Sequence, residues 1–599
     1  MHSRLAVFGL LAAVCALSFA ITNPYFQFVL TVSLVYAFAT LGLNVIFGYA
    51  GQPAFGHPAF FAVGAYASAL LTMRAGWPVY LAIAAAGPIT AGLSLAVAFT
   101  SLRLRGMSFG MVTIACASVM YIITQNWVEL TGGPMGITRI PKLPHITANW
   151  AFLPDAPHQI FVLLCLLLGL ALLLVDRMMA SPYGRAWLAV RENEPLAASV
   201  GIAPVQWKII GFVFGAGLSG VGGALFAHVI GFVDPTQMTW NAIGLFFIML
   251  IGGGAGTLLG PIVGALIFGM LPEVLRVAEI ARDLLLGLIL VLTLVLLPDG
   301  ITGFLQRRLK RSVPPREVPV SDDGPAIAES TSANPSRPAS IGEPLLTVRG
   351  VSQRFGGLLA LSDINFEVRR GEILGLVGPN GAGKTTLFNI LTGTTRATAG
   401  DVLFAGTRIT NMSAPRVAAQ GMARTFQITS VFPKLTVAEN VRIATHLWSN
   451  RNPASVLAKT RGFREREAEI DNEVSEILDL TGLAGLADVQ AEHLSYGNQR
   501  LLEVSIALGT RCRLLLLDEP AAGLNSSETA QLRKLVLALR NRGLTIIAIE
   551  HDMSFIMQSC DRIIVLDHGQ KIADGTAAQV SSDARVIEAY LGSGEVASA

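Results

Sequence analysis

Residues Leu374–Thr386 read Leu-Gly-Leu-Val-Gly-Pro-Asn-Gly-Ala-Gly-Lys-Thr-Thr. A short apolar strand is expected first, then a glycine-rich loop, then a helix that begins at Lys384. The spacing of Gly378, Gly383, Lys384 and Thr385 fits a phosphate-binding loop, in which backbone N–H groups at a helix N-terminus bind phosphate oxygens. The stretch therefore predicts the strand–loop–helix unit of an α/β nucleotide-binding domain.

The sequence upstream of this loop is unusually apolar. Of the 599 residues, 52% are hydrophobic and 14% are charged, whereas a soluble chain carries about 25% charged residues. A helix needs about 20 apolar residues to cross a bilayer. Candidate spans lie near 5–21, 27–48, 58–73, 79–102, 107–127, 159–175, 209–233, 241–252, 258–275 and 284–297. We predict a polytopic α-helical membrane domain of about eight to ten spans in residues 1–311.

The first apolar segment and the basic residues indicate how this domain is oriented. Segment 5–21 follows a single Arg and precedes another span, so we interpret it as a retained span rather than a signal peptide. Cytoplasmic loops are enriched in Lys and Arg. With a cytoplasmic N-terminus, more basic residues lie inside than outside. Those inside are Arg4, Arg103, Arg105, Arg177, Arg185, Arg191, Lys208, Arg307, Arg308, Lys310 and Arg311, and those outside are Arg74, Arg139, Lys142, Arg276 and Arg282. This orientation puts the nucleotide-binding domain in the cytoplasm, where ATP is.

The composition changes abruptly after residue 311. Residues 312–343 are rich in Pro, Ser, Ala and acidic side chains, which predicts a flexible linker. Residues 344–599 alternate short β-rich runs with helical stretches, which predicts an α/β domain with a parallel sheet. The net charge of +3 gives no sign of a nucleic-acid partner. The five scattered cysteines are interpreted as buried thiols without disulfides or metal.

Two acidic residues complete a predicted ATP site. Asp518 and Glu519 follow the apolar run 514–517, so both are expected at the end of a buried strand. Asp518 and Thr385 are expected to bind Mg²⁺, and Lys384 is expected to contact the β- and γ-phosphates. Glu519 is expected to polarise the attacking water. The other predicted phosphate contacts are Gly378, Asn380, Gly381, Gly383 and Thr386.

The stretch Leu-Ser-Tyr-Gly-Asn-Gln at 494–499 resembles the signature Leu-Ser-Gly-Gly-Gln of ATP-binding-cassette (ABC) ATPases, with Tyr496 and Asn498 as departures. The resemblance covers about residues 344–595 and implies further roles by position. Phe355 resembles the aromatic residue that stacks on adenine, although core packing is an alternative for it. Gln427 resembles the Q-loop glutamine, a catalytic residue and Mg²⁺ ligand, and His551 resembles the catalytic switch histidine.

The same resemblance implies a partner. In ABC proteins the signature of one cassette covers the ATP held by another, so Ser495 and the Gly497 N–H would face a γ-phosphate. One chain has one P-loop and one signature, which implies a second cassette, either another subunit or a second copy of this chain. Because Ser495 and Gly497 are both present, we expect Tyr496 to leave the signature active. In the D-loop-like stretch 522–525, Asn525 stands where Asp is usual.

The membrane half resembles the permease subunit of LIV-type ABC importers for branched-chain amino acids over about residues 25–305. The stretches that carry this resemblance are 41–52, 55–57, 130–137, 181–186, 191–194 and 251–257. It implies a bacterial inner-membrane importer that works in membrane lipid with a second permease and a periplasmic binding protein. Loop 177–208 would couple the two halves beside the Q-loop; the alternative is an ordinary amphipathic surface helix.

The substrate route is less clear from the sequence. No Asp, Glu, Lys or Arg lies deep inside a predicted span, which favours a solute without net charge. Asn44, Gln52, His57, Gln125 and His228 are candidates either for the route or for hydrogen bonds between packed helices. Urea, amides and aromatic acids stay open as substrates. An ABC exporter, against which the short loops argue, and an ATP-gated channel stay open as functions.

Overall fold

A computed structural model describes residues 9, 12–16, 18, 19, 21, 23–101, 104, 106–143, 156–275, 281–310 and 342–591. The chain divides into two compact units, Met1–Arg191 with Val205–Glu317 and Glu192–Pro204 with Val318–Ala599. About half of the predicted span 5–21 and nearly all of the predicted linker 312–343 lie outside the described residues.

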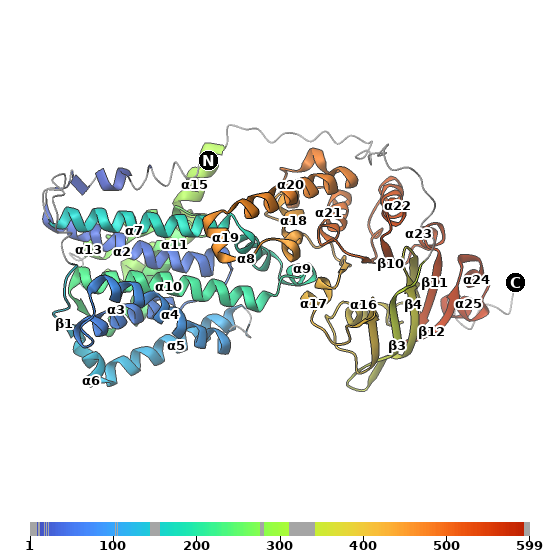
Figure 1. Cartoon of the computed structure of the whole chain (residues 1–599), viewed down its shortest axis with the longest axis horizontal. Coiled ribbons are helices and arrows are strands. Elements are labelled where there is room, and N and C mark those ends of the chain that lie inside the picture. Colours follow the sequence, from blue (N-terminus) through green and yellow to red (C-terminus); the bar gives the residue numbers. More distant parts are fainter. Residues whose placement is uncertain are drawn as a thin grey trace. The chain divides into compact units, whose positions relative to one another are not determined.

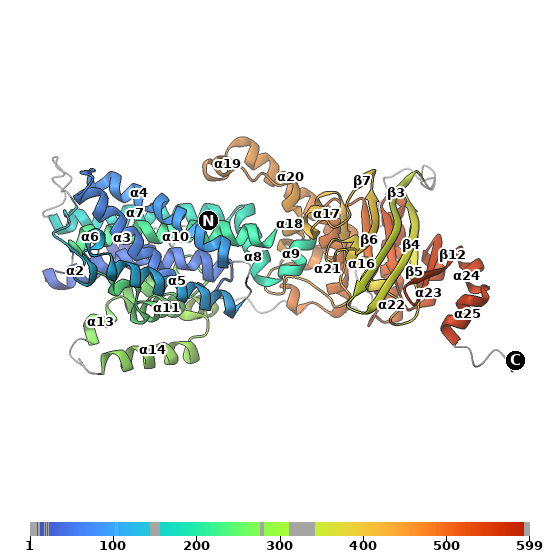
Figure 2. The ribbon, with the colours of Figure 1, turned by 90° about the horizontal axis from the view of Figure 1, so that it is seen from below.

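The first unit is a bundle of apolar helices (Figures 1 and 2). Within the described residues, six helices are long and apolar enough to cross a membrane: Pro24–Tyr49, Val79–Ser101, Met107–Asn126, Pro157–Met179, Pro204–Ile230 and Gly287–Leu305. The first of these joins α2 (Pro24–Leu43) to the π-helix η1 (Asn44–Tyr49), and the others contain α4 (Val79–Ser101), α5 (Met107–Asn126), α7 (Ala156–Met179), α10 (Pro204–Ile230) and α14 (Arg282–Leu296). The polytopic helical fold is confirmed.

Three further predicted spans are shorter helices. They are α3 (His57–Met73), α11 (Trp240–Gly253) and α12 (Gly260–Phe268). The predicted span 258–275 differs most, because α12 ends at Phe268 and a separate short helix, α13 (Leu271–Val274), follows. The remaining elements of this unit are α6 (Val128–Thr131), η2 (Gly133–Met135), β1 (Ile137–Thr138), α8 (Pro182–Glu192), β2 (Phe232–Val233), η3 (Pro235–Met238) and α15 (Gly300–Lys310).

Helices α2 and α10 approach each other through glycines. A Cβ built on Gly42 would lie 2.3 Å from the carbonyl oxygen of Gly215, and one on Gly215 would lie 2.4 Å from that of Gly42. Neither position can hold a larger residue without moving a backbone. Small residues of this kind let membrane helices pack closely.

Asn44 joins η1 to the glycine-rich end of α11. Its Oδ1 accepts a hydrogen bond from the Gly256 N–H at 2.8 Å, and its Nδ2 donates to the Thr257 carbonyl at 2.9 Å. The side chain is fully buried. These bonds agree with the packing role that was one of the two alternatives for Asn44.

The two buried histidines of the membrane unit also contact neighbouring segments. His57 Nε2 lies 3.2 Å from the Ala39 carbonyl, and His228 Nε2 lies 2.9 Å from Ser68 Oγ. The two glutamines have more local partners, Gln52 bonding to the Ala50 carbonyl and Gln125 to the Tyr121 hydroxyl. All four sets of contacts fit packing, and a role for any of these residues on the substrate route stays a prediction.

The second unit contains two sheets. The six-stranded sheet has the order β12 (Gln570–Gly575), β11 (Arg562–Asp567), β5 (Ile373–Val377), β10 (Thr545–Ile549), β9 (Leu514–Asp518) and β8 (Met422–Arg424). All its pairs are parallel except β11 with β12. The antiparallel sheet has the order β4 (Leu358–Arg369), β3 (Pro344–Phe355), β6 (Ala399–Phe404) and β7 (Thr407–Arg408). The predicted α/β domain with a parallel core is confirmed.

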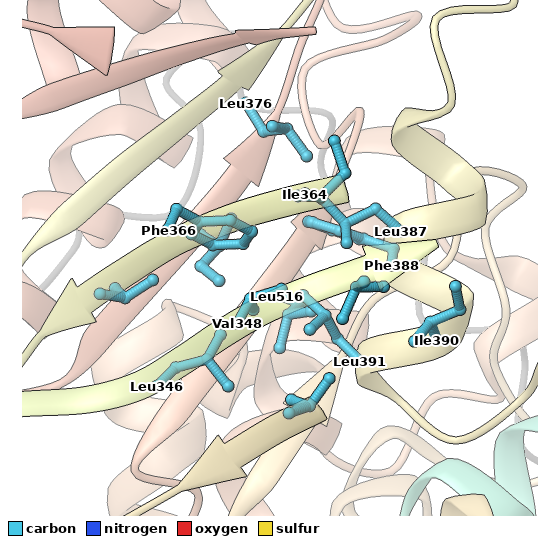
Figure 3. Close-up of a cluster of buried hydrophobic side chains, with 14 of the residues drawn as sticks. Leu346, Val348, Ile364, Phe366, Leu376, Leu387, Phe388, Ile390, Leu391 and Leu516 are labelled. Atoms are coloured by element: carbon cyan, nitrogen blue, oxygen red, sulfur yellow. The ribbon is translucent and has the colours of Figure 1, made fainter. Parts of the chain in front are cut away.

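Helix α16 (Lys384–Leu391) shares one apolar core with strands of both sheets (Figure 3). Phe388 and Leu391 pack against Val348 of β3 and Leu516 of β9, all at most 1% exposed. Burying one such side chain stabilises the fold by roughly 1.5–3 kcal/mol. The core therefore fixes α16 and the loop before it at the end of β5.

Helices and short turns complete this unit. They are α9 (Glu194–Ser199), α17 (Ala414–Ala419), α18 (Val437–Ala444), η5 (Thr445–Trp448), α19 (Pro453–Ala458), α20 (Arg461–Thr481), η6 (Ala484–Leu486), η7 (Ala491–His493), α21 (Tyr496–Gly509), α22 (Ser526–Asn541), α23 (Met553–Ser559), α24 (Ala577–Ser581) and α25 (Ala584–Leu591).

Candidate ATP site

The predicted P-loop joins β5 to α16, and two of its glycines have no possible substitute. Gly378 has φ +150°, and a Cβ there would lie 2.1 Å from the carbonyl oxygen of Leu566. Gly383 has φ +98°, and its Cβ would lie 2.6 Å from Leu361 Cδ2. A side chain at either position would be strained and would also collide with a neighbouring strand.

Lys384 is the buried cation of this loop. Its Nζ donates to the Gly378 carbonyl at 2.5 Å and to the Pro379 carbonyl at 3.0 Å. Burial lowers the pKa of Lys384, whereas the nearby carboxylates of Glu519 and Asp518 raise it. Of the other predicted phosphate contacts, Asn380, Gly381 and Thr385 are exposed and Thr386 is half-buried.

Glu519 brings the three predicted catalytic residues together. Its Oε1 accepts a hydrogen bond from Gln427 Nε2 at 3.2 Å and lies 3.1 Å from His551 Nε2. The residue follows β9 with φ +48°, a left-handed conformation that is costly for a side chain with a Cβ. Such strain is typical of functional sites, because the surrounding structure must hold it.

Asp518 has one oxygen in an ion pair and one without a partner. Its Oδ2 accepts a hydrogen bond from Arg424 Nη2 at 3.2 Å, and the two side chains are 1% and 7% exposed. Its Oδ1 is buried and has no hydrogen-bond partner among the described residues. Burial raises the pKa of Asp518, and Arg424 opposes that rise. A buried carboxylate oxygen without a donor is the kind of ligand that Mg²⁺ prefers, so this residue fits a metal site.

Arg424 was not singled out as a site residue by the sequence. Its guanidinium also donates to Asn389 Oδ1 at 2.7 Å, and it therefore ties α16 to the carboxylate of β9. Its only sequence signal is a charged residue at the end of an otherwise apolar strand, next to the Q-loop.

Glu550 is a second residue that the sequence did not single out. Its Oε1 accepts from the Ala521 N–H at 2.5 Å and its Oε2 from the His551 N–H at 3.2 Å. Burial raises its pKa, while these N–H groups lower it. The carboxylate thereby holds the start of the D-loop-like stretch and the backbone of His551 together.

The D-loop-like stretch ends in a helix cap. Asn525 Oδ1 accepts from the N–H groups of Ser527 at 3.0 Å and Glu528 at 2.9 Å, at the start of α22. Asn and Asp serve almost equally well at this position. The departure from Asp therefore keeps the local structure of the stretch.

The signature residues lie at the start of α21 rather than at the P-loop of this chain. Ser495 is exposed and caps the helix, accepting a hydrogen bond from the Asn498 N–H at 3.4 Å. A Cβ on Gly497 would lie 2.3 Å from Glu528 Oε1, so a side chain there would have to displace that carboxylate. The described contacts of both residues are with α21 and α22.

Phe355 ends β3 and is 49% exposed, which excludes the core-packing alternative. The exposed ring is free to stack on a planar group. Adenine stacking stays a prediction for this residue.

Comparisons with known proteins match both halves of the chain. Residues 25–295 match the family described as the permease component of branched-chain amino acid transport systems, residues 361–522 match ABC transporters, and residues 570–596 match the branched-chain amino acid ATP-binding cassette transporter family. LivG of Escherichia coli K12, a high-affinity branched-chain amino acid transport ATP-binding protein, is 43% identical over 251 residues, which are 42% of this chain and 98% of LivG. The chain belongs to the branched-chain amino acid ABC transporter family.

Members of this family are similar to the membrane half as well. The permease protein LivM of Salmonella typhimurium is 29% identical over 330 residues, which are 52% of this chain and 77% of LivM. In the ATP-binding half, the chain is similar to a crystal structure of a nucleotide-free ATP-binding cassette from an ABC transporter. The two are 31% identical, the match covers 42% of this chain and 100% of the cassette, and the TM-score is 0.37. The chain is a multi-pass membrane protein with an ATP-binding domain that hydrolyses ATP in transport.

Proposed function

We propose that this chain is the fused permease and ATPase subunit of an ABC importer that takes up branched-chain or related amino acids across the bacterial inner membrane. The two halves match different components of one kind of transport system, and LivG and LivM are described as separate proteins of that kind. The observation that carries the ATPase part is the convergence of Gln427 and His551 on one oxygen of Glu519.

In this proposal Glu519 polarises the water that attacks the γ-phosphate. Gln427 and His551 hold the carboxylate in place through the two contacts to Oε1. Lys384 neutralises charge on the β- and γ-phosphates. Thr385, Asp518 and Gln427 would hold Mg²⁺, which would neutralise the charge that develops on the phosphate oxygens.

The complete transporter needs partners in this proposal. Ser495, which is exposed at the start of α21, and the N–H of Gly497 would cover the ATP of a second cassette, which is another subunit or a second copy of this chain. A second permease completes the pathway, and a periplasmic binding protein delivers the solute. The cassette lies in the cytoplasm.

Helix α9 is the proposed coupling element. It belongs to the second unit, where it contacts α17. Ser199 and Val200 line a small cavity together with Phe426 and Ser430 of the Q-loop segment. Within the predicted coupling loop 177–208, Ala189 is fully buried in α8, so a charge there would disrupt folding rather than coupling.

Replacing Ser199 with Glu should uncouple ATP hydrolysis from uptake. The longer side chain has no room in the small cavity that Ser199 lines, so we expect it to displace α9 from the Q-loop segment. We expect basal ATP hydrolysis to persist while uptake into proteoliposomes falls at least several-fold. Gln206→Glu adds the same charge at an exposed position of α10 and should leave both activities unchanged. Normal uptake by a well-expressed Ser199→Glu variant would exclude this role for α9.

The substrate class is tested by competition. The transporter, reconstituted with its binding protein, should take up labelled leucine in an ATP-dependent manner, and unlabelled isoleucine and valine should compete. A Glu519→Gln transporter supplies the background uptake. Competition by urea, amides or aromatic acids instead would assign the same machinery to those solutes. ATP-dependent uptake of a strongly charged solute alone would contradict the proposal.

A further inference from the structure

Helix α21 carries a buried ion pair beside the Q-loop. Arg500 and Glu503 are both 3% exposed in their side chains, and Arg500 Nη1 lies 3.0 Å from Glu503 Oε2. Arg500 also donates to the Phe426 carbonyl at 2.9 Å and to the Gln427 carbonyl at 2.7 Å. The guanidinium therefore fixes the backbone of the predicted catalytic glutamine to the signature helix.

Glu503 holds the other side of the same loop. Its Oε1 accepts a hydrogen bond from the Ser430 N–H at 2.6 Å. The pair thus spans the Q-loop from residue 426 to residue 430. Because Ser199 of α9 and the adjacent Val200 line the same cavity as Glu503 and Ser430, this carboxylate lies at a cavity that the proposed coupling helix and the loop share.

Tyr496, which replaces a glycine of the usual signature, belongs to this arrangement. Its hydroxyl accepts a hydrogen bond from Arg500 Nη2 at 2.9 Å. Its ring lies against Gly523, where a Cβ would come within 3.0 Å of Tyr496 Cε1. The departure at Tyr496 therefore links the signature to Arg500 and to the D-loop-like stretch.

We propose that Arg500 and Glu503 are positioning residues for ATP hydrolysis, which keep Gln427 against Glu519 and make the Q-loop and the signature move as one piece when α9 moves. Neither residue contacts ATP in this proposal. Both act through the backbone of the Q-loop, where a charge-assisted bond is stronger than a neutral one. The proposal rests on the ATPase part of the proposed function and not on the transported solute.

The test compares Glu503→Gln with Glu372→Gln in the full-length chain in detergent. Glu372 is an equally buried carboxylate, which pairs with Arg562 at 2.7 Å and accepts from the Arg369 N–H at 2.7 Å, away from the Q-loop. We expect Glu503→Gln to lower kcat by roughly fivefold or more while KM for ATP stays within about twofold. The reason is that the change disturbs the position of Gln427 but removes no contact to the nucleotide. Glu372→Gln should lower Tm comparably and leave kcat nearly unchanged.

Two further variants separate positioning from a structural role. Arg500→Lys keeps the charge but cannot reach both carbonyls and the carboxylate, so it should lower kcat as Glu503→Gln does. Combining Glu503→Gln with Gln427→Ala should lower kcat no further than Gln427→Ala alone, since both changes remove the same contribution.

Several results would overturn the proposal. One is a wild-type kcat for Glu503→Gln or Arg500→Lys, since the pair would then stabilise the fold only. Another is a rise in KM without a fall in kcat, which would mean that the pair serves nucleotide binding. Independent, multiplicative losses in the Glu503→Gln/Gln427→Ala variant would show that Glu503 does not act through Gln427. Because the readouts are ATP hydrolysis and Tm, none of them depends on which solute is transported.

Discussion

Replacing Glu519 with Gln is expected to slow ATP hydrolysis by roughly two orders of magnitude or more while ATP still binds. The amide keeps the shape of the carboxylate and can still bond to Gln427 or His551, but it cannot polarise the attacking water. Single-turnover hydrolysis and an ATP dissociation constant, both measured on the full chain, separate the two effects.

The matched control for this change is Glu439→Gln. Glu439 forms a capping box at the start of α18, where its Oε2 accepts from the Thr436 N–H at 2.9 Å, and Gln serves this role as well as Glu. This variant should hydrolyse ATP at the wild-type rate. If Glu519→Gln does so too, the proposed role of Glu519 is wrong.

Replacing Lys384 with Ala should weaken ATP binding itself by roughly ten- to a hundredfold, the equivalent of losing about 1.5–3 kcal/mol from a hydrogen bond to a charged group. Lys384 is the buried cation of the loop, and its amine is already held between two backbone carbonyls beside the predicted phosphate site. Because the stabilisation of a folded protein by a ligand grows with the logarithm of the ligand concentration divided by Kd, ATP at a fixed concentration should raise the Tm of the wild type more than that of the variant.

Lys534→Ala is the control for the loss of a lysine, since Lys534 is exposed on α22. It should keep the full ATP-dependent rise in Tm. A normal rise for Lys384→Ala would contradict the proposed contact with the phosphates. Lys384→Ala and Glu519→Gln are also distinguishable from each other, because only Lys384→Ala is expected to lose affinity for ATP.

Much of this protein could be predicted from contiguous stretches of its sequence. The P-loop is a local strand–loop–helix unit, and the structure places it between β5 and α16, with positive φ angles at Gly378 and Gly383. Most of the membrane helices followed from runs of about 20 apolar residues. The span at 258–275 was wrong as one helix, because α12 ends at Phe268 and the separate helix α13 begins at Leu271.

Contacts between distant segments could not be predicted in this way. Gln427 and Glu519 are 92 residues apart in the sequence, and they meet because β8 pairs with β9 in the sheet. The same pairing of strands places the Arg424 guanidinium on Asp518, which no motif indicated. Asn44, a substrate candidate from its polarity alone, proved to bond to the backbone near Gly256.

The sequence by itself determined the two-part architecture, the P-loop and the residue types of the ATP site, because these depend on neighbours in the chain. Only the tertiary structure decided which of those residues touch. It also decided that Arg500 and Glu503 bond to the two ends of the Q-loop. It further decided that α9, and not α8 with Ala189, lies in the second unit. The physical reason is that hydrogen bonds and ion pairs act over about 3 Å, so they are set by strand order and helix packing and not by spacing along the chain.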